Sequence, residues 1–197
     1  VAYAETIHML GVRFLPSGLS RFIQLPLHEL TNQRICADEV TNFFDASFAE
    51  RLCEEDNFGD RIKIIEELFI KSLYKYDLQT DPQIAFAIEQ INRHQGKLPV
   101  QSLVEDICLC QRQFERKFKM NTGYTPKIYS RIMQFKNAVD LLRSATCDNL
   151  LSTAVHAGYY DVPHLSREIK RMSGNTPYSF LALPSPEEEV TLTYVEA

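Results

Sequence analysis

Arginine and lysine side chains recur at helical spacing in two separate segments of this chain. The first segment has a polar, mostly basic face made of Gln111, Arg112, Glu115, Arg116 and Lys119. The second has outward positions occupied by Val162, Pro163, Ser166, Arg167 and Lys170. An arginine guanidinium can donate two hydrogen bonds to guanine O6 and N7, and a helix with such a face fits the DNA major groove. Each face taken alone is also compatible with a solvated helix surface in an all-helical bundle.

The two segments belong to an internal repeat with an offset of 51 residues. The residues of the first copy are Phe114, Arg116, Phe118, Lys119, Gly123, Thr125, Pro126 and Tyr129. They align with Leu165, Arg167, Ile169, Lys170, Gly174, Thr176, Pro177 and Phe180. Just upstream the offset is 50, which pairs Val104 with Ala154 and Cys108 with Gly158. A repeated helix-turn-helix would produce this pattern.

Each copy is expected to fold as a helix, a tight turn and a second helix. In the second copy, Gly158 can end the first helix in the left-handed conformation, and Asp161 can cap the next helix. Pro163 then falls in a first helical turn, where its missing N–H costs little. The spacing predicts inward-facing side chains at Phe114, Phe118, Leu151, Ala154, Val155, Leu165, Ile169 and Met172.

The segment between the copies is predicted to be one long helix from Lys127 to about Ser144. Apolar residues recur every three or four positions, at Ile128, Ile132, Phe135, Ala138, Leu141 and Leu142. A helix of this length spans roughly 27 Å, so it could separate two recognition helices by about one DNA turn, roughly 34 Å. A single continuous core helix would give the same sequence pattern.

The acidic charge of the whole chain, −5, conceals a basic region. Residues 1–81 hold 8 basic and 14 acidic side chains, whereas residues 82–182 hold 13 basic and 8 acidic ones. Residues 183–197 hold 4 acidic side chains and no basic one. A basic module is the electrostatic requirement for binding the phosphates of a nucleic acid.

Four stretches of this basic region form a further pattern: Gln113-Phe-Glu-Arg-Lys-Phe-Lys119, Gly123-Tyr-Thr-Pro126, Ala157-Gly-Tyr-Tyr-Asp161 and His164-Leu-Ser-Arg-Glu-Ile-Lys-Arg171. In this order they resemble the AraC family of bacterial transcription regulators. The resemblance spans roughly residues 85–182. It implies a seven-helix DNA-binding domain whose two helix-turn-helix units insert recognition helices into successive major-groove segments of double-stranded DNA.

The resemblance also implies a role for individual side chains. It places contacts to base edges at Arg112, Glu115, Arg116, Val162, Pro163, Ser166 and Arg167. Contacts to the DNA backbone are expected at Gln111, Lys119, Lys127, Arg131, His164 and Lys170. Arg116 and Arg167 remain open to a structural ion-pair role instead. Val162 and Pro163 lack side-chain donors, so the second unit is expected to read DNA shape or a thymine methyl group, or to read little sequence.

The sequence departs from the family pattern at several positions of the first unit and the long helix. Cys110 stands at a helix-cap position where the family commonly has serine, and Cys108 stands where a glycine often makes the turn. A thiol caps poorly and a residue other than glycine resists positive φ, so we expect a looser first unit. Gln134 replaces an arginine that many relatives carry in the long helix, which could remove one backbone contact.

Residues 1–80 are predicted to be a partial α+β domain that senses an effector or forms a dimer. The segment Met9–Gly18 alternates apolar and polar residues before a Pro/Gly turn, which predicts a strand. Helices are expected over 46–58 and 60–76, followed by a polar linker over 77–82. This region also resembles, more weakly, the tail of uncharacterised N-terminal domains fused to AraC-type modules. Residues 81–182 would be the DNA-binding domain and residues 183–197 an acidic tail.

The remaining residues give little support to other classes of function. Five cysteines, at positions 36, 53, 108, 110 and 147, do not form a zinc-site pattern, so no metal or cofactor is expected. Catalytic residues are not expected either, because no nucleophile with a neighbouring base and no glycine-rich phosphate loop is visible. We expect a cytoplasmic regulator without a membrane segment, with an unidentified effector, a second copy or RNA polymerase as further partners. The alternative is a protein-interaction module on the same fold that has lost strong DNA binding.

Overall fold

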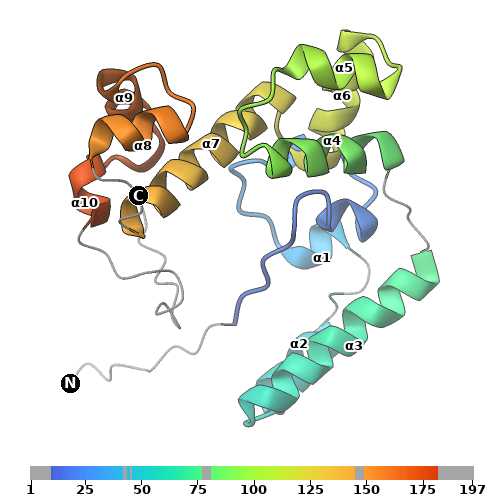
Figure 1. Cartoon of the computed structure of the whole chain (residues 1–197). Coiled ribbons are helices and arrows are strands. Elements are labelled where there is room, and N and C mark those ends of the chain that lie inside the picture. Colours follow the sequence, from blue (N-terminus) through green and yellow to red (C-terminus); the bar gives the residue numbers. More distant parts are fainter. Residues whose placement is uncertain (1–9, 42–43, 45, 77–80, 145–148, 182–197) are drawn as a thin grey trace, which may run out of the picture. The chain divides into compact units, whose positions relative to one another are not determined.

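The computed structural model describes residues 10–41, 44, 46–76, 81–144 and 149–181, and all regular elements in these ranges are helical (Figure 1). The first elements are the short 3-10 helices η1 (Leu19–Arg21) and η2 (Leu27–Glu29), then α1 (Ala37–Val40), α2 (Ala46–Glu54) and α3 (Phe58–Tyr76). They are followed by α4 (Pro82–Arg93), α5 (Val100–Ile107), α6 (Gln111–Thr122), α7 (Pro126–Arg143), α8 (Leu150–His156), α9 (Val162–Ser173) and α10 (Pro177–Leu181). The prediction of a mainly helical protein is confirmed.

The chain divides into two compact units. The first contains the described residues up to Ala85 together with Lys119–Gly123, and the second contains residues 86–118 and the described residues from Tyr124 onward. The candidate interface belongs mainly to the second unit, so the first is described only briefly.

An aromatic cluster forms the centre of the first unit. The ring of Phe69 from α3 lies 5.3 Å from that of Phe14, 4.9 Å from that of Phe22 and 5.9 Å from that of Phe44, measured between centroids. All three pairs meet edge to face, the arrangement that aromatic quadrupoles favour. Helix α3 therefore anchors the irregular segments before it.

The predicted strand near the N-terminus is wrong for the residues that the structure describes. Residues 10–15 have no regular structure and lead into a turn, and the described part of this unit contains no strand. Alternation of apolar and polar residues stabilises a strand only where a neighbouring strand supplies the ladder of backbone hydrogen bonds. The α+β assignment is therefore corrected to helices joined by irregular segments.

Both helices predicted in residues 46–76 are present, with a shifted boundary between them. Helix α2 ends at Glu54, four residues before the expected end, and α3 begins at Phe58. The side chain of Asn57 accepts hydrogen bonds from the backbone N–H groups of Gly59 (2.8 Å) and Asp60 (3.2 Å). This capping explains the start of α3. Most of the predicted 77–82 linker and the predicted tail at 183–197 lie outside the described residues.

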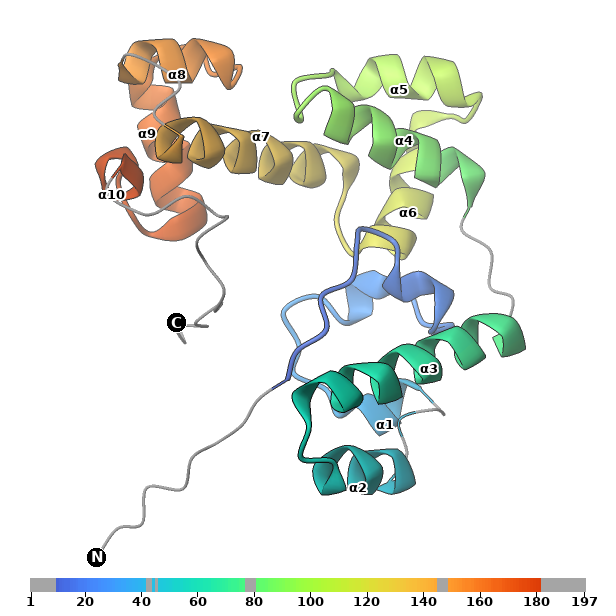
Figure 2. The same cartoon turned by 60° about the horizontal axis from the view of Figure 1, so that its bottom comes forward.

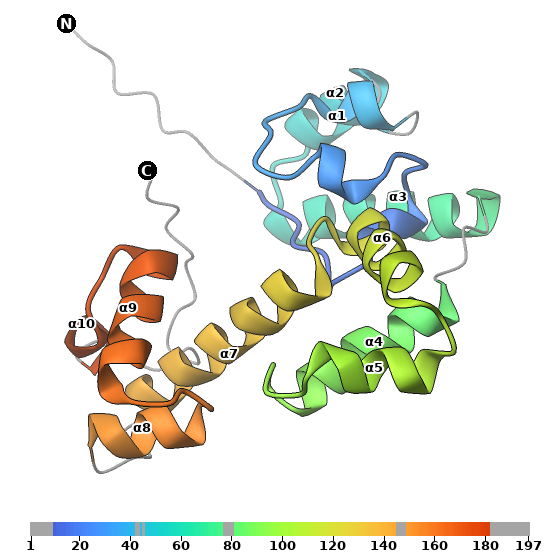
Figure 3. The ribbon, with the colours of Figure 1, turned by 90° about the horizontal axis from the view of Figure 1, so that it is seen from above.

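Helix α7 is the central element of the second unit. Helices α5 and α6 lie toward its N-terminal end, whereas α8, α9 and α10 pack around its C-terminal half, as Figure 2 and Figure 3 show from two further sides. Its bounds, Pro126–Arg143, confirm the predicted long helix with a start one residue earlier. The Thr125 side chain accepts a hydrogen bond from the Ile128 N–H (3.3 Å), which caps this start.

The turn in the second helix-turn-helix has the geometry that the sequence predicted. Gly158 adopts a φ of +80°, in the left-handed region. The Asp161 carboxylate accepts a hydrogen bond from the backbone N–H of His164 (2.7 Å) and caps α9. Both predictions, the glycine turn and the aspartate cap, are confirmed.

Ala154 of α8 is buried as predicted, whereas the predicted burial of Leu151 and Val155 in α8 and of Met172 in α9 is wrong. Leu151 and Val155 are 57% and 61% exposed, and Met172 is 36% exposed. The buried side chains of α8 are Thr153 and Ala154. These are small residues, and small side chains let two helices approach closely, so the face of α8 that packs near α7 is not its most apolar face.

Cys108 adopts a left-handed φ of +57° in the turn of the first helix-turn-helix. The second helix-turn-helix has Gly158 at the corresponding position. A side chain in this region costs about 1–2 kcal/mol, and the exposed Cys108 side chain contributes little packing in return. We therefore predict that Cys108→Gly raises the free energy of unfolding by about 1 kcal/mol.

Thermal and denaturant unfolding measure this effect, with Gly174→Ala as the matched reverse change. Gly174 has a φ of +74°, and a Cβ added there would meet no atom within 4 Å, so only the backbone conformation is at stake. That variant should lose about 1 kcal/mol. A destabilised Cys108→Gly protein would show that the turn is not strained.

Candidate nucleic-acid interface

The first helix-turn-helix consists of α5 and α6. The buried side chains of α5 are Leu103 and Ile107, and those of α6 are Phe114 and Phe118. Phe114 and Phe118 are four residues apart and therefore lie one above the other on one face of α6. The opposite face of α6 is left for contacts outside the unit.

Four of the five predicted contact residues of α6 are exposed and one is half-buried. Gln111, Arg112, Arg116 and Lys119 are exposed, whereas Glu115 is half-buried. The Gln111 amide Nε2 donates a hydrogen bond to the Glu115 carboxylate (2.9 Å). Arg112 and Arg116 are also four residues apart, so the two guanidinium groups extend from the same face of the helix.

The second helix-turn-helix, α8 and α9, repeats this arrangement. Leu165 and Ile169 of α9 are buried at the positions that correspond to Phe114 and Phe118. Among the predicted contact residues, Pro163, Arg167 and Lys170 are exposed, and Val162, His164 and Ser166 are half-buried. Arg167 Nε donates a hydrogen bond to the Pro163 carbonyl (3.2 Å), which uses one of its five N–H groups.

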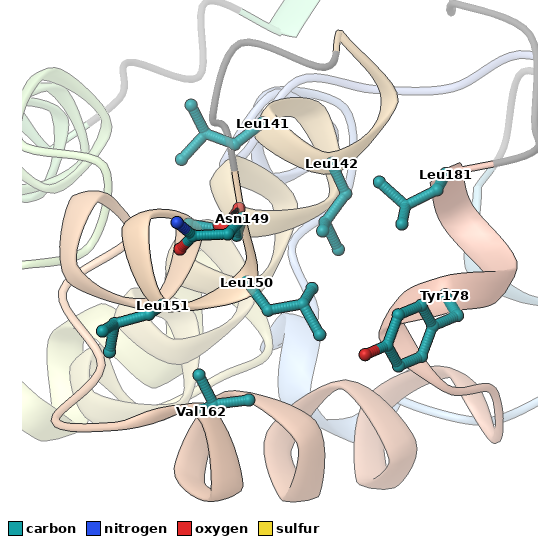
Figure 4. A pocket seen from close by; sticks show the side chains of 9 residues that line it. Leu141, Leu142, Asn149, Leu150, Leu151, Val162, Tyr178 and Leu181 are labelled. Atoms are coloured by element: carbon teal, nitrogen blue, oxygen red, sulfur yellow. Dashed lines mark hydrogen bonds between the residues drawn. The ribbon is translucent and has the colours of Figure 1, made fainter.

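Val162 lines an open hollow of about 580 Å³ (Figure 4). In that view its side chain points from the first turn of α9 toward Leu150 and Leu151 of α8. The other residues around the hollow include Leu141, Leu142, Tyr178 and Leu181. Its surroundings therefore give Val162 an apolar packing role in addition to its predicted contact with a base edge.

His164 is held by the turn before α9. Its Nδ1 accepts a long hydrogen bond from the backbone N–H of Tyr160 (3.5 Å), and its ring lies edge-on to that of Tyr159 at 5.2 Å. With Nδ1 as acceptor, Nε2 is the ring nitrogen that can donate a hydrogen bond. That nitrogen is a suitable donor to a phosphate oxygen.

The two predicted backbone contacts in α7 differ in their surroundings. Lys127 is exposed in the first turn of the helix. Arg131 instead forms a bidentate ion pair with Glu168 of α9, with Nη2 2.9 Å from Oε2 and 3.2 Å from Oε1. The sequence did not indicate this partner, which lies 37 residues away and one position after the expected contact residue Arg167.

Sequence reasoning missed two exposed side chains beside Arg167. Tyr160 is 91% exposed in the turn before α9, and Arg171 lies one helical turn beyond Arg167. Both line an open, polar hollow of about 500 Å³, together with Asp161, His164, Arg167 and Glu168. The four-residue spacing from Arg167 would have identified Arg171.

Tyr159 is buried beside the Arg131–Glu168 pair. The pKa of Tyr159 is raised to about 12, mainly by burial and also by the Glu168 carboxylate, while Arg131 opposes the rise. An unfolded tyrosine has a pKa of about 10. A raised pKa in the folded state stabilises the fold fully below pH 10, and this contribution is lost as the pH rises from about 10 to about 12.

We therefore predict that Tyr159→Phe makes the fold less sensitive to alkaline pH. The phenylalanine cannot ionise, so the decline in the free energy of unfolding between pH 10 and 12 should be shallower than in the unmodified protein. Denaturant unfolding at several pH values measures this slope. Tyr160→Phe is the control, because Tyr160 is 91% exposed and its replacement should leave the slope as in the unmodified protein. Equal slopes in all three proteins would contradict the prediction.

The described residues give no sign of two other kinds of site. No helix within the described ranges is long and apolar enough to span a bilayer. Among these same residues, no three or more His, Cys, Asp or Glu side chains gather where they could hold a metal ion.

Residues 103–182 match the family model described as a helix-turn-helix domain. A solved structure of the xylose-binding transcription activator xylR is 22% identical, with a TM-score of 0.49 over 54% of this chain and 28% of that one. A probable AraC family transcriptional regulator from Rhodopseudomonas palustris is 18% identical, with a TM-score of 0.47 over 54% of this chain and 100% of that one. A search of curated proteins finds no match. The chain spans only about a quarter of the length of xylR. Residues 103–182 are an AraC-type helix-turn-helix domain.

Proposed function

We propose that this chain is a sequence-specific regulator of transcription that inserts α6 and α9 into successive major-groove segments of one DNA duplex. The observation that carries this proposal is an arrangement of side chains that α6 and α9 share. In each copy, two apolar side chains four residues apart are buried, and an exposed arginine lies between them, Arg116 in α6 and Arg167 in α9. A core-forming helix would not need an exposed arginine at the same position of both copies, whereas base readout does.

The contacts differ between the two units. In α6, Arg112 and Arg116 would donate to guanine O6 and N7, while Glu115, held by Gln111, would accept from a cytosine amino group. In α9, Arg167 is the main candidate for base readout. Its neighbours Val162, Pro163 and Ser166 would contact a thymine methyl group or follow the shape of the groove.

The expected backbone contacts are arranged around these two helices. Lys119, Lys127, His164 and Lys170 would bind phosphates and so fix the register of the protein without reading sequence. For Arg131, the ion pair with Glu168 supports a positioning role in place of the phosphate contact expected from the sequence.

The parts outside the two helix-turn-helix units have proposed roles of their own. Residues 81–182 would be the DNA-binding domain. Residues 1–80 would bind an effector or a second copy, and residues 183–197 would be an acidic tail. The regulator would act in the cytoplasm of a bacterium, where it meets the chromosome, and would contact RNA polymerase if it activates transcription.

Selection of bound duplexes from a random pool tests the proposal. We expect an asymmetric site of about 20 base pairs with preferences in two segments about one turn apart. Affinity should fall with salt, with a slope of about −0.9 per phosphate contacted. Binding that ignores sequence, or that is missing even at low salt, would contradict the proposal.

A second candidate function is a protein-interaction module. Leu151 and Val155 are exposed on α8, the first helix of the second helix-turn-helix. They favour this second function, because apolar side chains exposed on one helix are typical of protein contacts. In the same selection this module would show weak binding without sequence preference.

A further inference from the structure

Two side-chain hydrogen bonds join the second helix-turn-helix to α7 and to the segment before α5. Lys97, in the segment between α4 and α5, donates a hydrogen bond from Nζ to the backbone carbonyl of His156 at the end of α8 (3.2 Å). Gln134 of α7 donates from Nε2 to the carbonyl of Gly158 in the turn of the second unit (2.9 Å). The turn before α9 is therefore held both by the long helix α7 and by the segment that leads into the first helix-turn-helix.

The glycines at this junction show how closely the backbones approach. A Cβ added to Gly158 would lie 2.7 Å from Cγ of Lys97 and 3.1 Å from Nε2 of Gln134. A Cβ added to Gly96 would lie 2.0 Å from the Ser130 carbonyl oxygen of α7. At these distances a larger residue would fit only if the neighbouring atoms moved. The segment at 96–97 is therefore packed tightly between α7 and the second helix-turn-helix.

The Arg131–Glu168 pair adds a charged connection on the same helix. Arg131 and Gln134 are three residues apart, so both project from one side of α7. The ion-paired side chains are only 34% and 16% exposed, and Glu168 also accepts from Nη2 of Arg171 (2.8 Å). A bidentate, partly buried pair has a more fixed geometry than a pair at the surface. It restrains the rotation of α9 about its own axis relative to α7.

We propose that a brace between the two helix-turn-helix units fixes the spacing of the two DNA segments the protein can read. The brace is formed by Lys97, Arg131, Gln134, Gly158 and Glu168. This inference rests on the proposed function. Two linked binding elements gain affinity from each other only where the linkage lets both engage together. A protein with a rigid linkage binds both DNA segments together at only one spacing. A protein with a loosened linkage binds both at several spacings, with a smaller gain in affinity at each. The brace residues are thus positioning residues.

The test compares one duplex at its natural spacing with two altered duplexes. The first is the duplex selected from the random pool, and the others carry one base pair inserted or removed between its two segments. The unmodified protein should bind the altered duplexes about 100-fold more weakly, the order of the gain from joint engagement. Glu168→Gln removes the charge but keeps the shape, and it should reduce this penalty to about tenfold or less.

Glu89→Gln is the matched control. Glu89 also forms an ion pair, with Arg93 one turn away within α4 at 2.8 Å. The side chains of Glu89 and Arg93 are both exposed. The two variants have the same change in net charge, but only Glu168→Gln opens the brace. Glu89→Gln should keep the full spacing penalty.

The ratio of affinities separates the possible outcomes. A general loss of stability would weaken binding to all three duplexes alike and leave the ratio unchanged. An unchanged ratio in folded Glu168→Gln overturns the brace. A wild-type protein with no sequence preference would instead overturn the proposed function. If Glu168→Gln does not fold, Gln134→Ala removes another bond of the brace, and the same ratio decides.

Discussion

Truncation of Phe118 to alanine should lower the free energy of unfolding by about 3–5 kcal/mol. Phe118 is fully buried in α6, with its ring centroid 5.6 Å from those of Phe114 and Tyr129. Removal of the ring leaves a cavity under the first recognition helix and takes away both edge-to-face contacts. Denaturant unfolding followed by circular dichroism measures the loss.

The control for Phe118→Ala removes an aromatic ring of similar size from the surface. Tyr160 is 91% exposed, so Tyr160→Ala should change the free energy of unfolding by less than about 0.5 kcal/mol. Comparable losses in the two variants would show that α6 does not pack through this face.

Replacement of Arg116 by alanine should weaken binding to the selected duplex by about 1–3 kcal/mol and relax base preference in only one of the two segments. The side chain is exposed on α6, whereas its neighbours Phe114 and Phe118 hold the helix in place from the other side. A repeat of the duplex selection with the variant reads the base preference directly. Unfolding measurements should show little change, because Arg116 is exposed.

Lys127→Ala provides the contrast to Arg116→Ala. Lys127 is exposed at the start of α7, and a phosphate contact there carries no sequence information. This variant should weaken all duplexes about equally and reduce the salt slope by about 0.9. If both variants change affinity and base preference in the same way, the division into base and backbone contacts is wrong.

The sequence predicted the parts of the fold that depend on local chemistry. Gly158 and Asp161 were identified because a left-handed turn and a helix cap each favour particular residue types. The repeat then transferred this reading to the first unit, where Cys108 adopts positive φ despite its side chain. The bounds of the long helix followed from Pro126 and the apolar spacing.

The parts that depend on distant partners were not predictable in this way. On α8, Thr153 is buried beside Ala154 while Leu151 and Val155 are exposed, because a close helix contact favours small residues. The pairing of Arg131 with Glu168 joins two helices and has no local signature. An alternating N-terminal segment predicted a strand whose partner strand does not occur in the described residues.

In the proposed complex, α6 and α9 occupy two major-groove segments of one duplex together. Methylation protection of guanine N7 on the selected duplex tests it most directly, because N7 faces the major groove. We predict two protected clusters on one face of the DNA, about 10 base pairs apart from centre to centre. The cluster read by α6 should lose its protection in Arg116→Ala while the other keeps it. A single protected cluster, or two clusters on opposite faces of the duplex, would contradict the account.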